Sequence, residues 1–137
     1  MILVDTNVWS EITKQPRDEH VLEWLKRNQE QLALSTFVLA ELWIGIIRLP
    51  SGRRRQELEA WCSAIERNYA ETLISFDAAM AKQFATLVEE RKLQKQEGKL
   101  FDLLIASQAK VSGMPVATRN AKDFGWTGVR VVDPWEP

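Results

Sequence analysis

The sequence contains very little of two residues that define common classes of site. It has one cysteine, Cys62, and one histidine, His20, in 137 residues. A single cysteine excludes an internal disulfide, and we expect Cys62 to be buried and inert in an amphipathic helix. A lone histidine with no cysteine near it argues against a zinc site, so we expect His20 to lie on the surface. No apolar run approaches the roughly 18 to 20 residues of a membrane-spanning helix. We therefore expect a protein of the reducing cytoplasm, with no signal peptide before its first strand.

An excess of either charge is also missing. Lysine and arginine number 18 against 19 aspartate and glutamate, which leaves a net charge of -1. Without an overall positive field, binding of nucleic acid requires a local basic patch or a metal ion. The run Arg53-Arg54-Arg55 is either such a phosphate-binding patch or the solvated start of an amphipathic helix, and the second is more usual.

Short apolar strands alternate with helical patterns along the chain. We expect strands at residues 1–4, 32–35, 72–76, 116–118 and 129–132, and helices at 9–14, 18–28, 37–49, 53–69, 77–96 and 101–113. No repeat or linker interrupts this order, so residues 1–137 are expected to form one domain. The alternation predicts an α/β fold, a three-layer α/β/α sandwich around a central parallel sheet of four to five strands.

Asp5 follows the first apolar run directly, together with Thr6 and Asn7. In parallel sheets, ligands bind at the edge formed by the carboxyl ends of the strands, which is where this pattern places Asp5. The alternative is that Asp5 or Asn7 simply caps the next helix. Other carboxylates at the same edge would favour the first interpretation.

Three more acids stand at comparable places. Glu41 is the only acid of a nearly all-apolar helix, and it either faces the same edge as Asp5 or shares a thin solvent stripe with Arg48. Asp102 opens another apolar helix and is equally suited to capping it. Asp123 follows the fourth strand, where it joins the edge or caps a turn before Phe124.

Carboxylates gathered at one edge need a cation. Two carboxylates 4 Å apart repel by roughly 4 kcal/mol at an effective dielectric constant of 20. Oxygen ligands without histidine or cysteine favour Mg²⁺ or Mn²⁺, as one or two ions. Such ions activate water and neutralise a phosphodiester, which would let a slightly acidic protein cut nucleic acid.

The motifs together resemble those of a known family. They are Ile2-Leu3-Val4-Asp5-Thr6-Asn7, Ala40-Glu41-Leu42, Asp102-Leu103-Leu104-Ile105-Ala106, Ala117-Thr118-Arg119-Asn120, Asp123-Phe124 and Asp133-Pro134-Trp135. In this order, across nearly the whole chain, they resemble PIN-domain ribonucleases of the VapC-type toxin group, close to the FitB-like branch.

The resemblance implies a PIN fold, metal-dependent RNA cleavage, a cognate VapB-like antitoxin and a homodimer. Carried over by position, Asp5 and Asp102 would be metal ligands, and Glu41 a ligand or general base. Thr6 and Thr118 would hold these ligands in place or contact phosphate.

The fourth acid departs from part of the family. Some relatives, FitB-like ones included, have an acid where Asn120 stands here, whereas others have one that matches Asp123. Asn120 can coordinate or hydrogen-bond but supplies no charge, so we select Asp123 as the fourth catalytic and metal-binding acid. Arg119 and Asn120 are then expected on the substrate side, with further basic residues guiding the RNA backbone. These are Lys99, Lys122 and Lys14.

The resulting hypothesis is a Mg²⁺- or Mn²⁺-dependent endoribonuclease, the toxin of a VapBC-type pair, that leaves 5′-phosphate and 3′-hydroxyl ends. Three alternatives stay open. A receiver-like regulatory module would use Asp77 as phosphoacceptor and Lys122 as its lysine. A haloacid-dehalogenase-like phosphatase would need an aspartate where Asn7 stands. A PIN-like domain that binds RNA without cutting it is the third.

Overall fold

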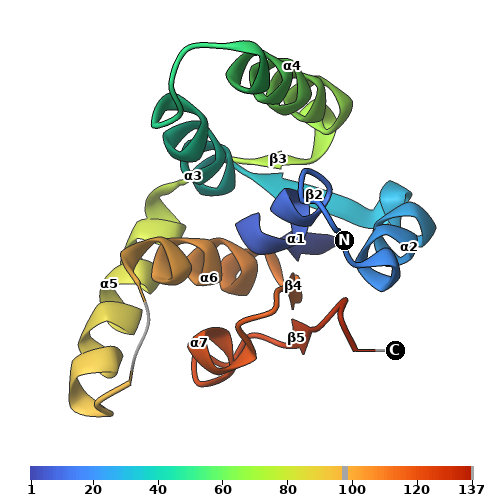
Figure 1. Ribbon diagram of the computed structural model, residues 1–137. Coiled ribbons are helices and arrows are strands. Elements are labelled where there is room, and N and C mark those ends of the chain that lie inside the picture. Colours follow the sequence, from blue (N-terminus) through green and yellow to red (C-terminus); the bar gives the residue numbers. More distant parts are fainter. Residues whose placement is uncertain (97–98, 137) are drawn as a thin grey trace.

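The central sheet has five strands, all parallel. The computed structural model describes residues 1–96 and 99–136, and within them the strand order is β3-β2-β1-β4-β5 (Figure 1). The strands are β1 (Ile2–Val4), β2 (Leu32–Ser35), β3 (Leu73–Ile74), β4 (Val116–Ala117) and β5 (Val131–Val132). Parallel neighbours require crossover connections, and helices supply them here. The expected α/β/α sandwich with a parallel sheet is confirmed.

Helices connect the strands throughout the described residues. They are α1 (Thr6–Glu11), α2 (Glu19–Arg27), α3 (Thr36–Ile47), α4 (Arg53–Asn68), α5 (Ala78–Leu93), α6 (Leu100–Ser112) and α7 (Ala121–Gly125). Short 3₁₀ turns, η1 (Gln29–Gln31) and η2 (Ala70–Thr72), lead into β2 and β3. Helix α3 packs against α4, and α5 against α6, as Figure 1 shows.

The core is formed by the strands and by the faces of the helices that pack against the sheet. Leu3 and Val4 of β1 and Leu34 of β2 are fully buried. Burying one such side chain contributes about 1.5–3 kcal/mol relative to leaving it in water. Cys62 also belongs to this core, and burial raises the pKa of its thiol to about 11, so it is inert as expected. His20 is exposed, again as expected.

Element ends differ from expectation in a few places. Helix α1 begins at Thr6 rather than at residue 9, because Asp5 caps it by accepting a hydrogen bond from the backbone N–H of Thr6. The expected strands 72–76, 116–118 and 129–132 shorten to two residues each as β3, β4 and β5.

The longest described helices, α4 and α5, have 16 residues each. Within the described ranges, none combines the length and apolarity required to traverse a bilayer.

Candidate active site

Asp5 and Thr118 meet at the carboxyl edge of the sheet. The register pairs Val4 of β1 with Ala117 of β4, so the residues that follow these strands stand side by side. The Thr118 hydroxyl donates to Oδ2 of Asp5 at 2.7 Å, and the Thr6 N–H donates to Oδ1 at 2.8 Å. Asp5 is only 3% exposed. Both of its oxygens are therefore held, and capping α1 and facing the sheet edge prove to be compatible roles for Asp5.

Asn7 connects the segments that follow β1 and β4. Its side-chain amide lies 3.4 Å from Oδ2 of Asp5 and 3.4 Å from the Thr118 hydroxyl. Its side-chain carbonyl accepts the backbone N–H of Arg119 at 3.3 Å. The sequence alone does not predict this bridging position of Asn7, because it depends on strands that lie far apart in the chain.

Glu41 lies on α3 and faces the same region. The Thr6 hydroxyl donates to Oε1 of Glu41 at 2.7 Å. Burial raises the pKa of Glu41, and repulsion from Asp102 adds to this, while the Thr6 hydrogen bond and the charge of Lys99 oppose it. Glu41 is half-buried and hydrogen-bonded to Thr6, which favours the sheet-edge interpretation over a solvent stripe shared with Arg48.

Asp102 lies in the first turn of α6 and is 8% exposed. The helix begins at Leu100, so Asp102 is not the N-cap, but its Oδ2 accepts the backbone N–H of Lys99 at 3.3 Å. Burial is the main cause that raises the pKa of Asp102 to about 6, with further repulsion from Asp5 and Asp123.

A buried polar contact fixes α6 relative to the sheet. Gln108, fully buried on α6, accepts a hydrogen bond from the Ser35 hydroxyl at the end of β2. Its amide donates to the carbonyl of Ile74 at the end of β3, at 3.0 Å. Gln108 thus links the helix that carries Asp102 to the ends of two strands, a role that no local sequence pattern indicates.

Asp123 is half-buried on α7, close enough to Asp5 and Asp102 to raise the pKa of each by repulsion. It does not cap α7, because the N-cap position belongs to Asn120. Asn120 is exposed, and its backbone N–H donates to the Thr118 hydroxyl at 3.0 Å. Of the two candidates for a fourth acidic position, Asp123 is the one whose charge acts on the other acids.

The four acids form one electrostatic group. Burial and mutual repulsion raise the pKa of three of them, namely Asp5, Glu41 and Asp102. The charge of Lys99 opposes this rise at Glu41 and Asp102. In the part of the chain that the structure describes, no three His, Cys, Asp or Glu side chains are placed so that together they could hold a metal ion. Mg²⁺ typically binds one or two carboxylates and keeps several waters. An all-oxygen, strongly anionic group of this kind fits a hydrated hard divalent ion.

Asp77, the phosphoacceptor of the receiver-like alternative, does not join this group. It is exposed after the edge strand β3, where it caps α5 by accepting the N–H of Met80 at 2.9 Å. It is also not among the groups that shift the pKa of the acids. The receiver-like alternative therefore has no support in the fold.

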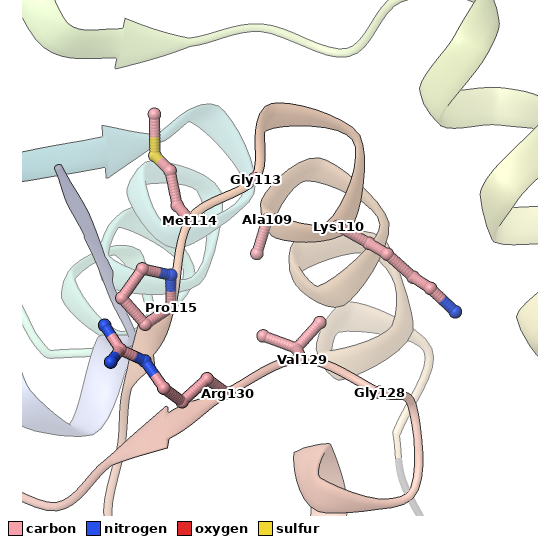
Figure 2. Close-up of a pocket in the computed structure, with 8 residues that line it drawn as sticks. All are labelled: Ala109, Lys110, Gly113, Met114, Pro115, Gly128, Val129 and Arg130. Atoms are coloured by element: carbon pink, nitrogen blue, oxygen red, sulfur yellow. The ribbon is translucent and has the colours of Figure 1, made fainter.

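A separate cavity of about 310 Å³ lies at the opposite edge, where β4 and β5 begin (Figure 2). It is lined by Ala109, Lys110, Gly113, Met114, Pro115, Gly128, Val129 and Arg130. Figure 2 shows the Lys110 and Arg130 side chains extending away from each other, so their charges do not converge on one ligand. The acid group, rather than this cavity, is the candidate for catalysis.

Comparison with known proteins agrees with the geometry. The chain is 36% identical over 141 residues to the plasmid stability protein StbB of Pseudomonas syringae pv. tomato, covering 99% of both chains. It is 34% identical to the toxin FitB of Neisseria gonorrhoeae, over 98% of this chain and 99% of FitB. The crystal structure of FitAcB from the same species matches with a TM-score of 0.93 and 32% identity over the full length of both chains. The VapC ribonuclease Y4jK of Sinorhizobium fredii is 33% identical over 100% of this chain and 99% of its own. A model of the PIN domain matches residues 2–125, and the chain belongs to the PIN-domain family.

Proposed function

We propose that the protein is a divalent-metal-dependent endoribonuclease and the toxin of a VapBC-type toxin-antitoxin pair, acting in the cytoplasm. The observation that carries the proposal is that the carboxylates of Asp5 after β1, Glu41 on α3, Asp102 on α6 and Asp123 on α7 lie close enough for each to raise the pKa of at least one other. Full-length relatives named as a VapC ribonuclease and as the toxin FitB support the reaction class and the biological role.

In this proposal Asp5 and Asp102 hold Mg²⁺ or Mn²⁺, and Asp123 adds negative charge beside them. When bound, the ion supplies activation of a water molecule and neutralisation of phosphate charge. The Thr6 hydroxyl holds one oxygen of Glu41, and we assign the other oxygen as the acceptor of the proton that the attacking water releases. The water oxygen bonds to phosphorus as the P–O3′ bond breaks. The leaving oxygen takes up a proton, which yields 5′-phosphate and 3′-hydroxyl ends.

RNA would approach over the exposed residues beside the acids. Arg119, Asn120 and Lys122 are exposed along the segment from β4 to α7. By contrast, the Thr118 hydroxyl is fully buried and already donates to Asp5. This favours a role for Thr118 in orienting Asp5 rather than in contacting phosphate. Lys14 forms an ion pair with Glu11 at 3.3 Å, so it is a weaker candidate for guiding the backbone.

The test is digestion of defined RNAs with and without Mg²⁺ or Mn²⁺, using Asp5→Asn and Asp102→Asn variants. Asp77→Asn is the matched control, because Asn caps helices as well as Asp does and Asp77 lies outside the acid group. We expect cleavage by the wild type and by Asp77→Asn, loss of cleavage with either acid variant, and loss with a chelator. RNA binding without any cleavage would leave the non-cutting PIN-like alternative. Full activity of Asp5→Asn would overturn the assignment.

The antitoxin would bind beside Glu41. A cavity of about 150 Å³ is lined there by residues of α1, α3 and α4, Thr6 and Glu41 among them. Its apolar lining residues include Leu42, Ile46, Leu58 and Trp61. On α3, Ile47 is 61% exposed beside it. We propose that an apolar segment of a VapB-like antitoxin lies here with a basic side chain directed at the acids, and that a homodimer presents two such sites.

A further inference from the structure

The closing motif Asp133-Pro134-Trp135 has no part in the chemistry above. The turn that carries Trp135 is nevertheless fixed: the Trp135 backbone N–H donates to Oδ1 of Asp133 at 2.9 Å, and Pro134 between them is buried. The Arg119 guanidinium carbon lies over the Trp135 ring, 5.0 Å from its centroid. The C-terminal segment thus places an aromatic surface under a cation of the active-site edge.

Arg119 is tied to the acid group through its backbone. Its N–H donates to the side-chain carbonyl of Asn7, and the preceding residue, Thr118, holds Asp5. Among the described residues, no ion pair engages the Arg119 side chain. A guanidinium that stacks on an aromatic ring uses its face, so the N–H donors in its plane stay available for bidentate binding of a phosphate.

We propose that Trp135 is a positioning residue for RNA: its ring holds the Arg119 guanidinium beside the segment that follows β4, where it binds a backbone phosphate of the RNA outside the acid group. The proposal rests on the proposed ribonuclease function. An unsupported arginine at an exposed position samples many rotamers, and the ring restricts it to those that face the RNA. Trp135 acts through Arg119 and need not touch the RNA itself.

A double-mutant cycle tests this assignment. KM and kcat for a short single-stranded RNA would be measured with Mg²⁺ for the wild type, Arg119→Ala, Trp135→Leu and the double variant. We expect KM to rise about tenfold in Arg119→Ala and about threefold in Trp135→Leu with kcat nearly constant, since a phosphate contact supplies uniform binding. In the double variant, KM should match that of Arg119→Ala, because coupled residues are not additive.

Two further variants separate positioning from folding. Trp135→Phe keeps an aromatic face and should retain most of the wild-type KM, and Arg119→Lys should behave like Arg119→Ala because it lacks the planar fork. Additive increases in KM, or a Trp135→Leu effect that persists without Arg119, would overturn the proposal. If the wild type itself neither binds nor cuts RNA, the proposed function fails instead, which distinguishes the two outcomes.

Discussion

The Thr118 hydroxyl has three polar neighbours at the acid group. It donates to Asp5 at 2.7 Å, accepts the Asn120 N–H at 3.0 Å and lies 3.4 Å from the Asn7 amide. A hydrogen bond to a buried carboxylate favours the charged form and offsets part of the burial that raises the pKa of Asp5. The Thr118 hydroxyl therefore both orients Asp5 and lowers its pKa.

Replacing this hydroxyl should reduce activity more than stability. Thr118→Val removes a hydrogen bond to a carboxylate, a contact worth about 1.5–3 kcal/mol. If that loss falls on the orientation of Asp5, cleavage should slow by about 10- to 100-fold. Thr118→Ser keeps the hydroxyl and should retain most activity. Initial cleavage rates of both variants on one RNA measure the effect, and equal rates would show that the hydroxyl has no role.

The pKa of Asp102 predicts how stability depends on pH in metal-free protein. Folding raises this pKa from the ordinary value of 3.8 to about 6, so the folded state binds the proton more tightly than the unfolded state. The stabilisation is complete below about pH 4 and is lost as the pH rises through about 6.

Asp102→Asn removes this dependence. At pH 7 the variant should gain up to about 3 kcal/mol over metal-free wild type, since one pKa unit corresponds to about 1.4 kcal/mol, and at pH 4.5 much less. Urea unfolding at both pH values, with chelator present, gives the comparison. An equal difference at the two pH values would contradict the cause that we assign.

At the scale of the secondary-structure element, the position of α6 depends on the buried side-chain amide of Gln108. Both ends of the Gln108 side chain are hydrogen-bonded, to Ser35 and to the Ile74 carbonyl, and both partners lie at strand ends. Helical positions 102 and 108 belong to the same rigid segment, so the contact that fixes Gln108 also fixes Asp102.

Gln108→Leu should lower the free energy of unfolding by about 1–3 kcal/mol, because the Ser35 hydroxyl and the Ile74 carbonyl lose buried partners. It should also slow cleavage by displacing Asp102. Gln56→Leu, on the exposed side of α4, is the control and should change stability by no more than about 0.5 kcal/mol. Urea unfolding measures both, and equal destabilisation would refute a special role for Gln108.

At the scale of the whole molecule, the four acids of the acid group lie on elements from different parts of the chain. Divalent ions that bind the folded state alone should therefore stabilise the entire fold by mass action, by about 2.7 kcal/mol at a hundredfold excess over Kd. We expect Mg²⁺ or Mn²⁺ to raise the melting temperature of the wild type and of Asp77→Asn. Asp5→Asn and Asp102→Asn should lose most of that rise. An equal rise in all four proteins would place the ion elsewhere.

Apart from the short helix α7 (Ala121–Gly125), which was not predicted, the order and type of the elements could be predicted because they depend on local patterns. Hydrophobic runs and caps such as Asp18 and Asp77 indicated the helices, and the β2 boundaries at residues 32–35 matched. The ends of β3, β4 and β5 did not match, because strand length depends on neighbouring strands that the local sequence does not reveal. The contacts of Asn7, Gln108 and Trp135 could not be predicted from the sequence either, since each joins segments that are distant in the chain.

By itself, the sequence determined that strands and helices alternate, and that Asp5, Glu41, Asp102 and Asp123 stand at or near places where strands end and helices begin. Hydrophobic periodicity is a local property, so it can be recognised in the sequence before the fold is known. Only the tertiary structure decided which acids act on one another. Pairing β1 with β4 in parallel register sets Asp5 beside Thr118, and the packing of α3, α6 and α7 brings the other three carboxylates to the same edge. Strand order depends on contacts between segments that are distant in the chain, so no local pattern predicts it.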